Sequence, residues 1–167
     1  MKSTIKKNVG RIALLTIAST LTVTALAGRS NCWMTGGGSI FDSAGETIVE
    51  GRNTHGFVVH CDPRNSDNLQ INWEGNRFHL TSLTGAMCID DPLLTPETPD
   101  AQFDTFIGMG EGRLNNVNGY GIYFVFTDDG QPGVGDTALI IITDPNGVEV
   151  RNIEGSLTFG NHQAHSN

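Results

Sequence analysis

The sequence predicts an all-β fold, an antiparallel β-sandwich or a jelly-roll-like arrangement, preceded by an N-terminal signal peptide. Three observations support this fold class. Several short stretches alternate apolar and polar residues with a period of two, no long stretch after the N-terminal segment has helical periodicity, and the chain's 21 glycines recur with asparagine at turn positions. Short strands separated by such turns are typical of sandwiches and jelly rolls.

The N-terminus has the three parts of a secretory signal peptide. Residues 1–11 carry four basic residues and no acid, an apolar and hydroxyl-bearing run follows, and it ends in Ala25-Leu26-Ala27, an Ala-x-Ala cleavage site. A retained membrane anchor is the alternative, but the run is shorter than the roughly 20 residues that a helical span needs. We therefore expect residues 1–27 to be cleaved and residues 28–167 to form one domain, secreted to the periplasm or outside the cell.

Removal of the signal peptide makes the chain strongly acidic. The whole chain has 10 basic and 18 acidic residues, a net charge of −8; four of the basic residues and none of the acidic ones lie in residues 1–27, so the mature chain has six against eighteen, or −12. Such a chain repels phosphate backbones and anionic lipid, which disfavours nucleic acid and membrane surfaces as partners. An extracellular protein or polysaccharide, or a cation, is compatible with this charge. The sequence does not define the oligomeric state.

The predicted strands follow in order along the mature chain. "NLQINW" (68–73) and "RFHLTSL" (77–83) alternate on either side of the turn "EGN", which predicts a hairpin. "GIYFVFT" (121–127) and "TALIIIT" (137–143) are continuously apolar, as in strands buried on both faces or at a sandwich core. "DPNG" (144–147) then predicts a type I turn. By contrast, the proline-rich and acidic segment 90–101 predicts a solvated loop within the domain.

The segment "IGMGEGRL" (107–114) is unusual because it spaces three glycines by two. On a strand, Gly108, Gly110 and Gly112 would share one face and leave it bare, which allows a backbone or an aromatic ring to approach closely. A loose loop is the alternative interpretation.

Three cysteines in an exported protein raise the question of a disulfide before that of a metal. We favour Cys61 with Cys88, because each ends a strand-like run and begins an acidic turn. Pairs that use Cys32 remain open. Because Cys32 lies next to the new N-terminus, it could be a free or intermolecular thiol.

The stretch "THGFVVHCD" (54–62) contains the residue types of a metal or catalytic site. On a strand, however, His55 shares one face with Cys61 while His60 shares the other with Asp62, so the two histidines point in opposite directions. Two more histidines, His162 and His165, lie near the C-terminus. A metal site built in space from His60, Asp62, His162 and His165, or from a pair that includes His55, is the functional alternative to an ordinary strand.

The acidic loop "TDDGQPGVGDT" (127–137) is the candidate calcium site. Asp128, Asp129 and Asp136 lie in a glycine-rich turn with free carbonyl groups, and calcium takes several oxygen ligands in flexible arrangements. The loop does not match an EF-hand, since Leu139 stands where a glutamate is needed. The alternative is a solvated acidic turn whose aspartates accept Asx-turn hydrogen bonds.

Enzyme motifs are mostly absent from the sequence. There is no Gly-x-Ser-x-Gly elbow and no His-Glu-x-x-His, and "TGGGSI" lacks the lysine of a phosphate-binding loop. Asp90, Asp91 and Asp104 could supply the carboxylate pair of a glycoside hydrolase. Four aromatic residues could stack on sugars if they are exposed: Trp33, Trp73, Tyr120 and Tyr123.

Several blocks in a fixed order cover about residues 34–165: "MTGGGSI", "HGFVVHCD", "NLQINWEGNRFHL", "CIDDP", "AQFDTFIGMGEGRLN", "FTDDGQPGVGDTALIIITD" and "GNHQAH". Together they resemble the post-COAP domain of exported bacterial proteins. The resemblance implies an extracellular β-rich domain, usually attached to surface or adhesin-like modules, without an established catalytic activity.

The sequence thus favours a secreted, non-catalytic module with a structural or interaction role, associated with adhesins. It assigns no cofactor, and calcium is the one candidate. A carbohydrate-binding module is the first alternative, which requires exposed coplanar aromatic rings. A metal- or carboxylate-dependent extracellular hydrolase is the second, which requires a cleft where His or Asp side chains converge.

Overall fold

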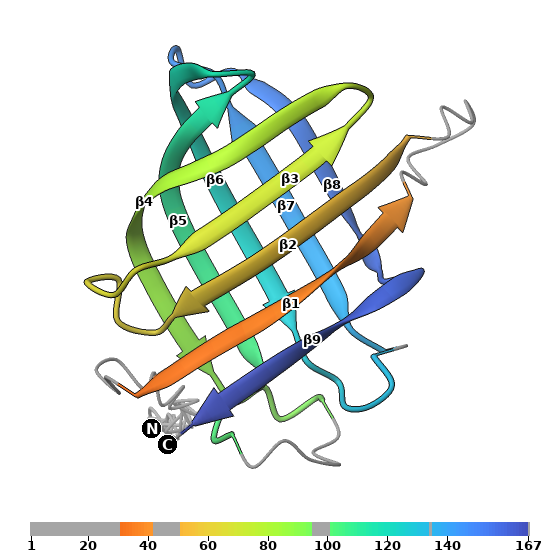
Figure 1. Ribbon diagram of the computed structural model, residues 1–167. Coiled ribbons are helices and arrows are strands. Elements are labelled where there is room, and N and C mark those ends of the chain that lie inside the picture. The colour runs from red at the N-terminus through yellow and green to blue at the C-terminus, as the bar shows by residue number, and fades with distance from the viewer. Residues whose placement is uncertain (1–30, 42–50, 95–100, 134, 167) are drawn as a thin grey trace, which may run out of the picture.

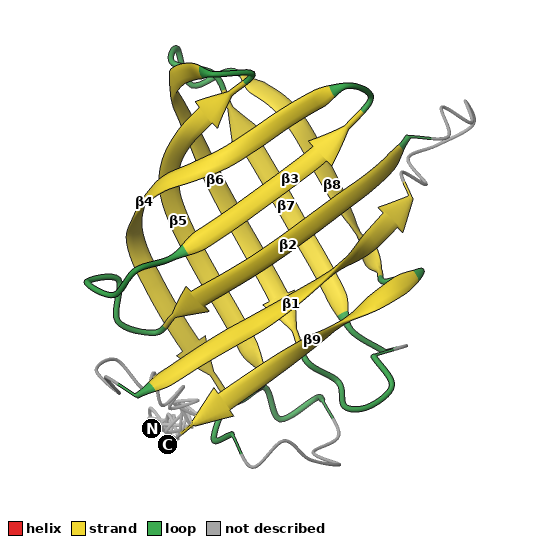
Figure 2. Ribbon diagram, viewed as in Figure 1, coloured by secondary structure: helices red, strands yellow, loops and turns green. Residues whose placement is uncertain are grey.

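A computed structural model describes residues 31–41, 51–94, 101–133 and 135–166 (Figures 1 and 2). The predicted signal peptide and part of the predicted 90–101 loop lie outside these residues. The described segments form nine strands: β1 (Cys32–Phe41), β2 (Arg52–His60), β3 (Asn68–Trp73), β4 (Asn76–Ile89), β5 (Thr105–Leu114), β6 (Val117–Thr127), β7 (Thr137–Thr143), β8 (Glu149–Ser156) and β9 (Phe159–Ser166). None of the described residues belongs to a helix that is long and apolar enough to cross a membrane.

All nine strands belong to one antiparallel sheet with the order β8-β7-β6-β5-β4-β3-β2-β1-β9. Strands β1 to β7 each pair with the next strand along the chain, and β9 pairs with the free side of β1. The sheet curls over, so that β1, β2, β3 and β9 lie in front of β5 to β8 in Figure 1. The all-β prediction is confirmed. A sandwich of two sheets or a jelly roll was expected, but the hydrogen bonds join the strands into one curled sheet. The reason is that strands adjacent along the chain are also adjacent in the sheet.

Strand β4 makes the curl. It is the longest strand, with 14 residues, and its pairing with β5 shifts register between Leu80 and Ser82 and again between Leu83 and Gly85. Such bulges bend a strand and increase its twist. The first half of β4 therefore continues the front half of the sheet with β3, and its second half belongs to the back half (Figure 1).

The core lies between the two halves of the curled sheet. Alternate residues of each strand point into it, and the largest fully buried side chains include four phenylalanines, Phe78, Phe106, Phe124 and Phe126. Phe57 of β2 stacks on Phe126 of β6 with a ring-centroid distance of 4.3 Å, which joins the front half to the back half. Burial of these large rings contributes strongly to the apolar stabilisation of the fold.

The three glycines of β5 face this core, which confirms the first of the two interpretations of that segment. A Cβ atom on Gly108 would overlap the ring of Phe124, and one on Gly112 would overlap the ring of Phe78. A Cβ atom on Gly110 would likewise lie only 2.7 Å from Cδ1 of Leu80. Bare backbone on β5 thus makes room for aromatic rings from its two neighbouring strands.

The apolar strands β6 and β7 bury only their inward sides. Their outward residues are partly exposed and continue the register of β4 and β5, so that Met87, Ile107, Val125 and Leu139 form one row across four strands. These two strands were expected either to be buried on both faces or to line a core on one face, and the structure shows the second arrangement.

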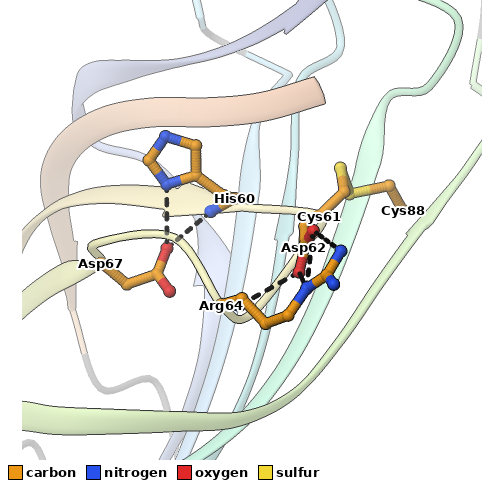
Figure 3. Close-up of polar contacts among 6 residues, drawn as sticks. All are labelled: His60, Cys61, Asp62, Arg64, Asp67 and Cys88. Carbon is orange, nitrogen blue, oxygen red and sulfur yellow. Dashed lines mark hydrogen bonds and ion pairs between the residues drawn. A yellow bond between two sulfur atoms is a disulfide. The ribbon is translucent and has the colours of Figure 1, made fainter. Parts of the chain in front are cut away.

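The Cys61–Cys88 disulfide is present, with a Cα–Cα distance of 5.7 Å, and it ties the residue after β2 to the end of β4 (Figure 3). Cys32 is a free cysteine. It begins β1 and is buried at 5% exposure, and its carbonyl accepts a hydrogen bond from the Cys61 amide at 3.0 Å. Cys32 is thus a free cysteine, as one of the sequence interpretations had it, but its residue is buried in this structure.

Candidate functional site

Strand β2 separates the two histidines of "THGFVVHCD", as its alternation predicts. His55 is buried at 6% exposure and points into the core, whereas His60 points outward. The amide of His60 donates to Asp67 Oδ1 at 2.7 Å, and its Nδ1 lies 3.1 Å from the same oxygen (Figure 3). The backbone amide and the Nδ1 atom of His60 thus both contact Asp67, which lies in the loop that follows β2.

Asp62 lies beyond the end of β2 and pairs with Arg64. The Arg64 Nε donates to Asp62 Oδ1 at 2.8 Å, and the hydrogen bonds from Arg64 lower the pKa of the Asp62 carboxyl to about 2 (Figure 3). The side chain of Arg64 is 85% exposed, so this is a surface ion pair that contributes little to stability.

On β9, His162 and His165 point to opposite faces because they are three residues apart on a strand. His162 is fully buried, whereas His165 stacks on Trp33 of β1 at the outer face, with a centroid distance of 4.9 Å. His60 is in register with Trp33 on its other side. The structure therefore does not bring His60, Asp62, His162 and His165 together.

One of the histidine pairs considered from the sequence does form: His55 meets His162 inside the core, with 2.7 Å between their Nε2 atoms. His162 Nδ1 lies 2.9 Å from the carbonyl oxygen of Thr127, so it must carry a proton and donate. The Nε2 of neutral His162 is then an acceptor, and His55 Nε2 donates to it. His55 Nδ1 is buried without a hydrogen-bond partner.

Burial keeps both imidazoles neutral. Desolvation, together with the nearby His162, lowers the pKa of His55 from 6.5 to about 3. Desolvation likewise lowers the pKa of His162 to about 4, against the opposing effect of its bond to Thr127. The rings pack against Phe57 and Phe126, so the pair is a hydrogen-bonded part of an aromatic core.

The aspartates of the 127–137 loop hold strand β9 in place. Asp136 Oδ2 accepts from the His162 amide at 2.6 Å, and Asp128 Oδ2 accepts from the Ala164 amide at 2.8 Å. Their second oxygens accept from loop amides, those of Asp129 and Gly130. Because β9 is an edge strand, these carboxylates satisfy amides that no further strand pairs with.

The candidate metal ligands can now be placed. Asp128 and Asp136 are buried, Asp129 is exposed, and burial raises the pKa of Asp136. Among the described residues, no three His, Cys, Asp or Glu side chains are grouped so as to hold a metal ion. Calcium binding by this loop stays one of two interpretations, and we favour the other, an acidic turn, because its two buried aspartates already accept hydrogen bonds from the amides of β9.

Of the carboxylates considered for hydrolysis, Asp104 and Asp91 are engaged internally, Asp91 by the Leu93 amide at 3.0 Å, whereas Asp90 is exposed. Both oxygens of Asp104 accept from the Asp91 amide, at 3.0 and 3.1 Å, and Thr105 Oγ1 donates to Asp104 Oδ1 at 2.7 Å. Burial raises the pKa of Asp104. Asp104 thus closes the loop that precedes β5.

A groove that the sequence did not reveal lies at one end of the sheet, on the outer face. It has a volume of about 550 Å³, and among its lining residues are Arg52, Arg77 and four asparagines, Asn72, Asn76, Asn115 and Asn116. A smaller pocket of about 160 Å³ adjoins it and shares Arg77 and Asn116 with it. Gln70, His79 and Arg113 complete this second pocket. We call the two together the arginine groove.

Two tight turns build the arginine groove, and both lie at the upper end of Figure 1. Glu74 and Gly75 between β3 and β4 both have positive φ, as do Asn115 and Asn116 between β5 and β6, which is the type I′ pattern of two-residue hairpins. The turns are tied together, since Asn115 Oδ1 accepts from the Arg77 amide at 2.9 Å and Asn115 Nδ2 donates to Asn76 at 2.9 Å.

The arginines of the groove are exposed and have no described carboxylate within ion-pair distance. The ion pairs of the described residues join His60 to Asp67 and Arg64 to Asp62. Arg52, Arg77 and Arg113 therefore keep their charge available, although acidic residues outnumber basic ones along the chain. The sequence signal was weak: these arginines are far apart along the chain, and only the pairing of β2, β3, β4 and β5 brings them together.

Comparison with known proteins gives no match to any family model, curated protein or solved structure. The resemblance to the post-COAP domain therefore stays an expectation.

Proposed function

We propose that this chain is a secreted, non-catalytic binding module, and that the arginine groove is its binding surface. The observation that carries the proposal is the convergence of Arg52, Arg77 and Arg113 on one groove, in which Glu74 is the one described carboxylate of the lining and forms no ion pair with them. Arginine is suited to this role because its planar guanidinium binds oxyanions through two parallel hydrogen bonds.

A non-catalytic role agrees with how the buried polar side chains are used. The His55–His162 pair is enclosed by aromatic rings, and Asp128, Asp136 and Asp104 accept hydrogen bonds from backbone amides. General acid–base catalysis requires such groups to face a substrate site. In the described structure these five side chains stabilise strands and loops, so they support a scaffold more than a hydrolase.

The compartment in this proposal is extracellular. The Cys61–Cys88 disulfide is compatible with an oxidising environment, in which such bonds persist. The curled sheet, whose two halves pack face to face like the layers of a sandwich, serves as the rigid support that holds the groove at one end. An interaction role of this kind is what the resemblance to post-COAP domains implies.

The test is a binding profile of the mature, oxidised protein against an array of extracellular polysaccharides, peptides and proteins. A variant with Arg52→Gln and Arg77→Gln is compared with Arg64→Gln, a control that removes an exposed arginine outside the groove. We expect at least one ligand that wild type and the Arg64 variant bind equally and the double variant loses. Identical profiles for wild type and the double variant would contradict the proposal.

A further inference from the structure

Resting on the proposed function, we infer that the arginine groove binds a carbohydrate chain that carries isolated carboxylates, such as a uronate-containing oligosaccharide. Arg77 and Arg113 are the carboxylate-binding residues, and the asparagines around them bind hydroxyl groups.

The register of the strands places the two arginines as neighbours. Arg113 of β5 is opposite His79 of β4, and Arg77 precedes His79 by two residues on the same outward face. Residues two apart on a strand are separated by roughly 7 Å. Both arginines line the smaller pocket of about 160 Å³, which is large enough for one carboxylate held between two guanidinium groups.

The rest of the lining fits hydroxyl groups better than further anions. Asn72, Asn76, Asn115 and Asn116 line the larger part of the groove, together with Thr54. A carboxamide has two N–H donors and two acceptor lone pairs, so Asn72, Asn76 and Asn115 keep capacity for a sugar hydroxyl beyond the hydrogen bonds that they make within the protein. Glu74 is among the lining residues as well and supplies an acceptor-only group that densely charged anions would avoid.

The charge of the whole protein argues for a ligand with sparse charge. The chain has a net charge of −8, so a polymer with a charge on every unit is repelled wherever it extends beyond the three arginines. The attraction of the arginines is screened over about 8 Å at physiological ionic strength. An isolated carboxylate can therefore be held locally, while nucleic acid is disfavoured.

An outward row of residues leads from the groove across the front half of the sheet. The outward row that contains Arg113 and His79 runs on through Gln70 to Gly56 and Gly37. A Cβ on Gly56 would have no atom within 4 Å, so this position is open and without a side chain. Backbone left bare in this way permits close approach of a ligand.

The experiment titrates the mature, oxidised protein with a hexasaccharide of alternating glucuronate and N-acetylglucosamine, measured by calorimetry. Parallel titrations use the same hexasaccharide with its carboxyl groups reduced to alcohols, and a short polyglutamate peptide. The variants are Arg77→Gln and Arg113→Gln, with Arg64→Gln as the matched control. Circular dichroism confirms that each variant is folded.

We expect binding of the uronate hexasaccharide, at least tenfold weaker binding of the reduced form, and at least tenfold weaker binding by the Arg77 and Arg113 variants, with no change for the Arg64 variant. Equal binding of the reduced form would overturn the carboxylate inference and leave the groove as a binding site. Binding of polyglutamate alone would overturn the carbohydrate class in the same way. Uronate binding that both groove variants retain would refute the groove itself, whereas no binding of the uronate hexasaccharide would overturn the uronate inference and leave the proposed function to the ligand array.

Discussion

The buried His55–His162 pair should make the protein less stable in mild acid. Both imidazoles are neutral in the folded protein, with pKa values of about 3 and about 4, whereas an exposed histidine in the unfolded chain titrates near 6.5. Below pH 6.5 the unfolded chain therefore binds more protons than the folded one. Because protons then favour the unfolded state, the free energy of unfolding falls as the pH falls from 6.5 toward the folded-state values.

The size of the effect at pH 5 follows from linkage. At that pH neither buried ring is protonated in the folded state, so each histidine costs about 2 kcal/mol, the equivalent of 1.5 pH units. The pair together lowers the free energy of unfolding by about 4 kcal/mol between pH 7.5 and pH 5, a large part of a typical domain's stability. Asp136 and Asp104 act in the opposite direction, because burial raises their pKa and acid neutralises them within the fold.

The assay is urea unfolding of the oxidised protein at pH 7.5, 6 and 5. His55→Phe keeps the ring stacking with Phe126 and removes one of the two titrating groups, so the loss between pH 7.5 and 5 should drop to about 2 kcal/mol. If that variant does not fold, ¹⁵N spectra of the wild-type imidazoles provide the second readout, with His162 protonated only at Nδ1 down to pH 5. A change of less than 1 kcal/mol in the wild type, or titration of both rings near 6.5, would refute the reasoning.

Four further predictions concern stability. Gly108→Ala should lower the free energy of unfolding by about 1–3 kcal/mol because the new methyl group overlaps Phe124, whereas Gly56→Ala, at an open position, should cause no loss; equal effects in urea unfolding would contradict this. Replacing Cys61 and Cys88 together by alanine should cost roughly 3.5 kcal/mol, given their separation of 27 residues, and an unchanged urea midpoint would be the contrary result. Asp136→Asn should cost about 1–3 kcal/mol because one of the two accepting oxygens becomes an NH2 donor, which faces either the His162 amide or the Asp129 amide. Millimolar calcium should leave the wild-type thermal midpoint unchanged relative to chelator, and a rise that Asp136→Asn abolishes would establish a calcium site in this loop.

The sequence predicted those features that depend on local pattern. Alternation alone placed His55 inside and His60 outside, because strand geometry fixes the face of every second residue. The spacing of Gly108, Gly110 and Gly112 likewise predicted a bare face for rings, and the two strand-end cysteines predicted the disulfide.

What the sequence could not predict depends on register between distant strands. Nothing in the local pattern says that Asp128 and Asp136 accept from the amides of β9, since that contact exists only because β9 pairs with β1 at the open edge of the curled sheet. For the same reason, Arg77 and Arg113 appear as isolated surface charges along the chain. They become neighbours only when the bulged pairing of β4 with β5 is known.

The most direct test of the arginine groove is where a ligand binds. The mature chain has six arginines, so the Nε–Hε signals of a ¹⁵N-labelled sample can be followed one by one during titration with the glucuronate-containing hexasaccharide. The binding model predicts that the signals of Arg77 and Arg113 shift on saturation while that of Arg64 stays in place. Saturable binding that moves the Arg64 signal and leaves Arg77 and Arg113 unchanged would contradict it.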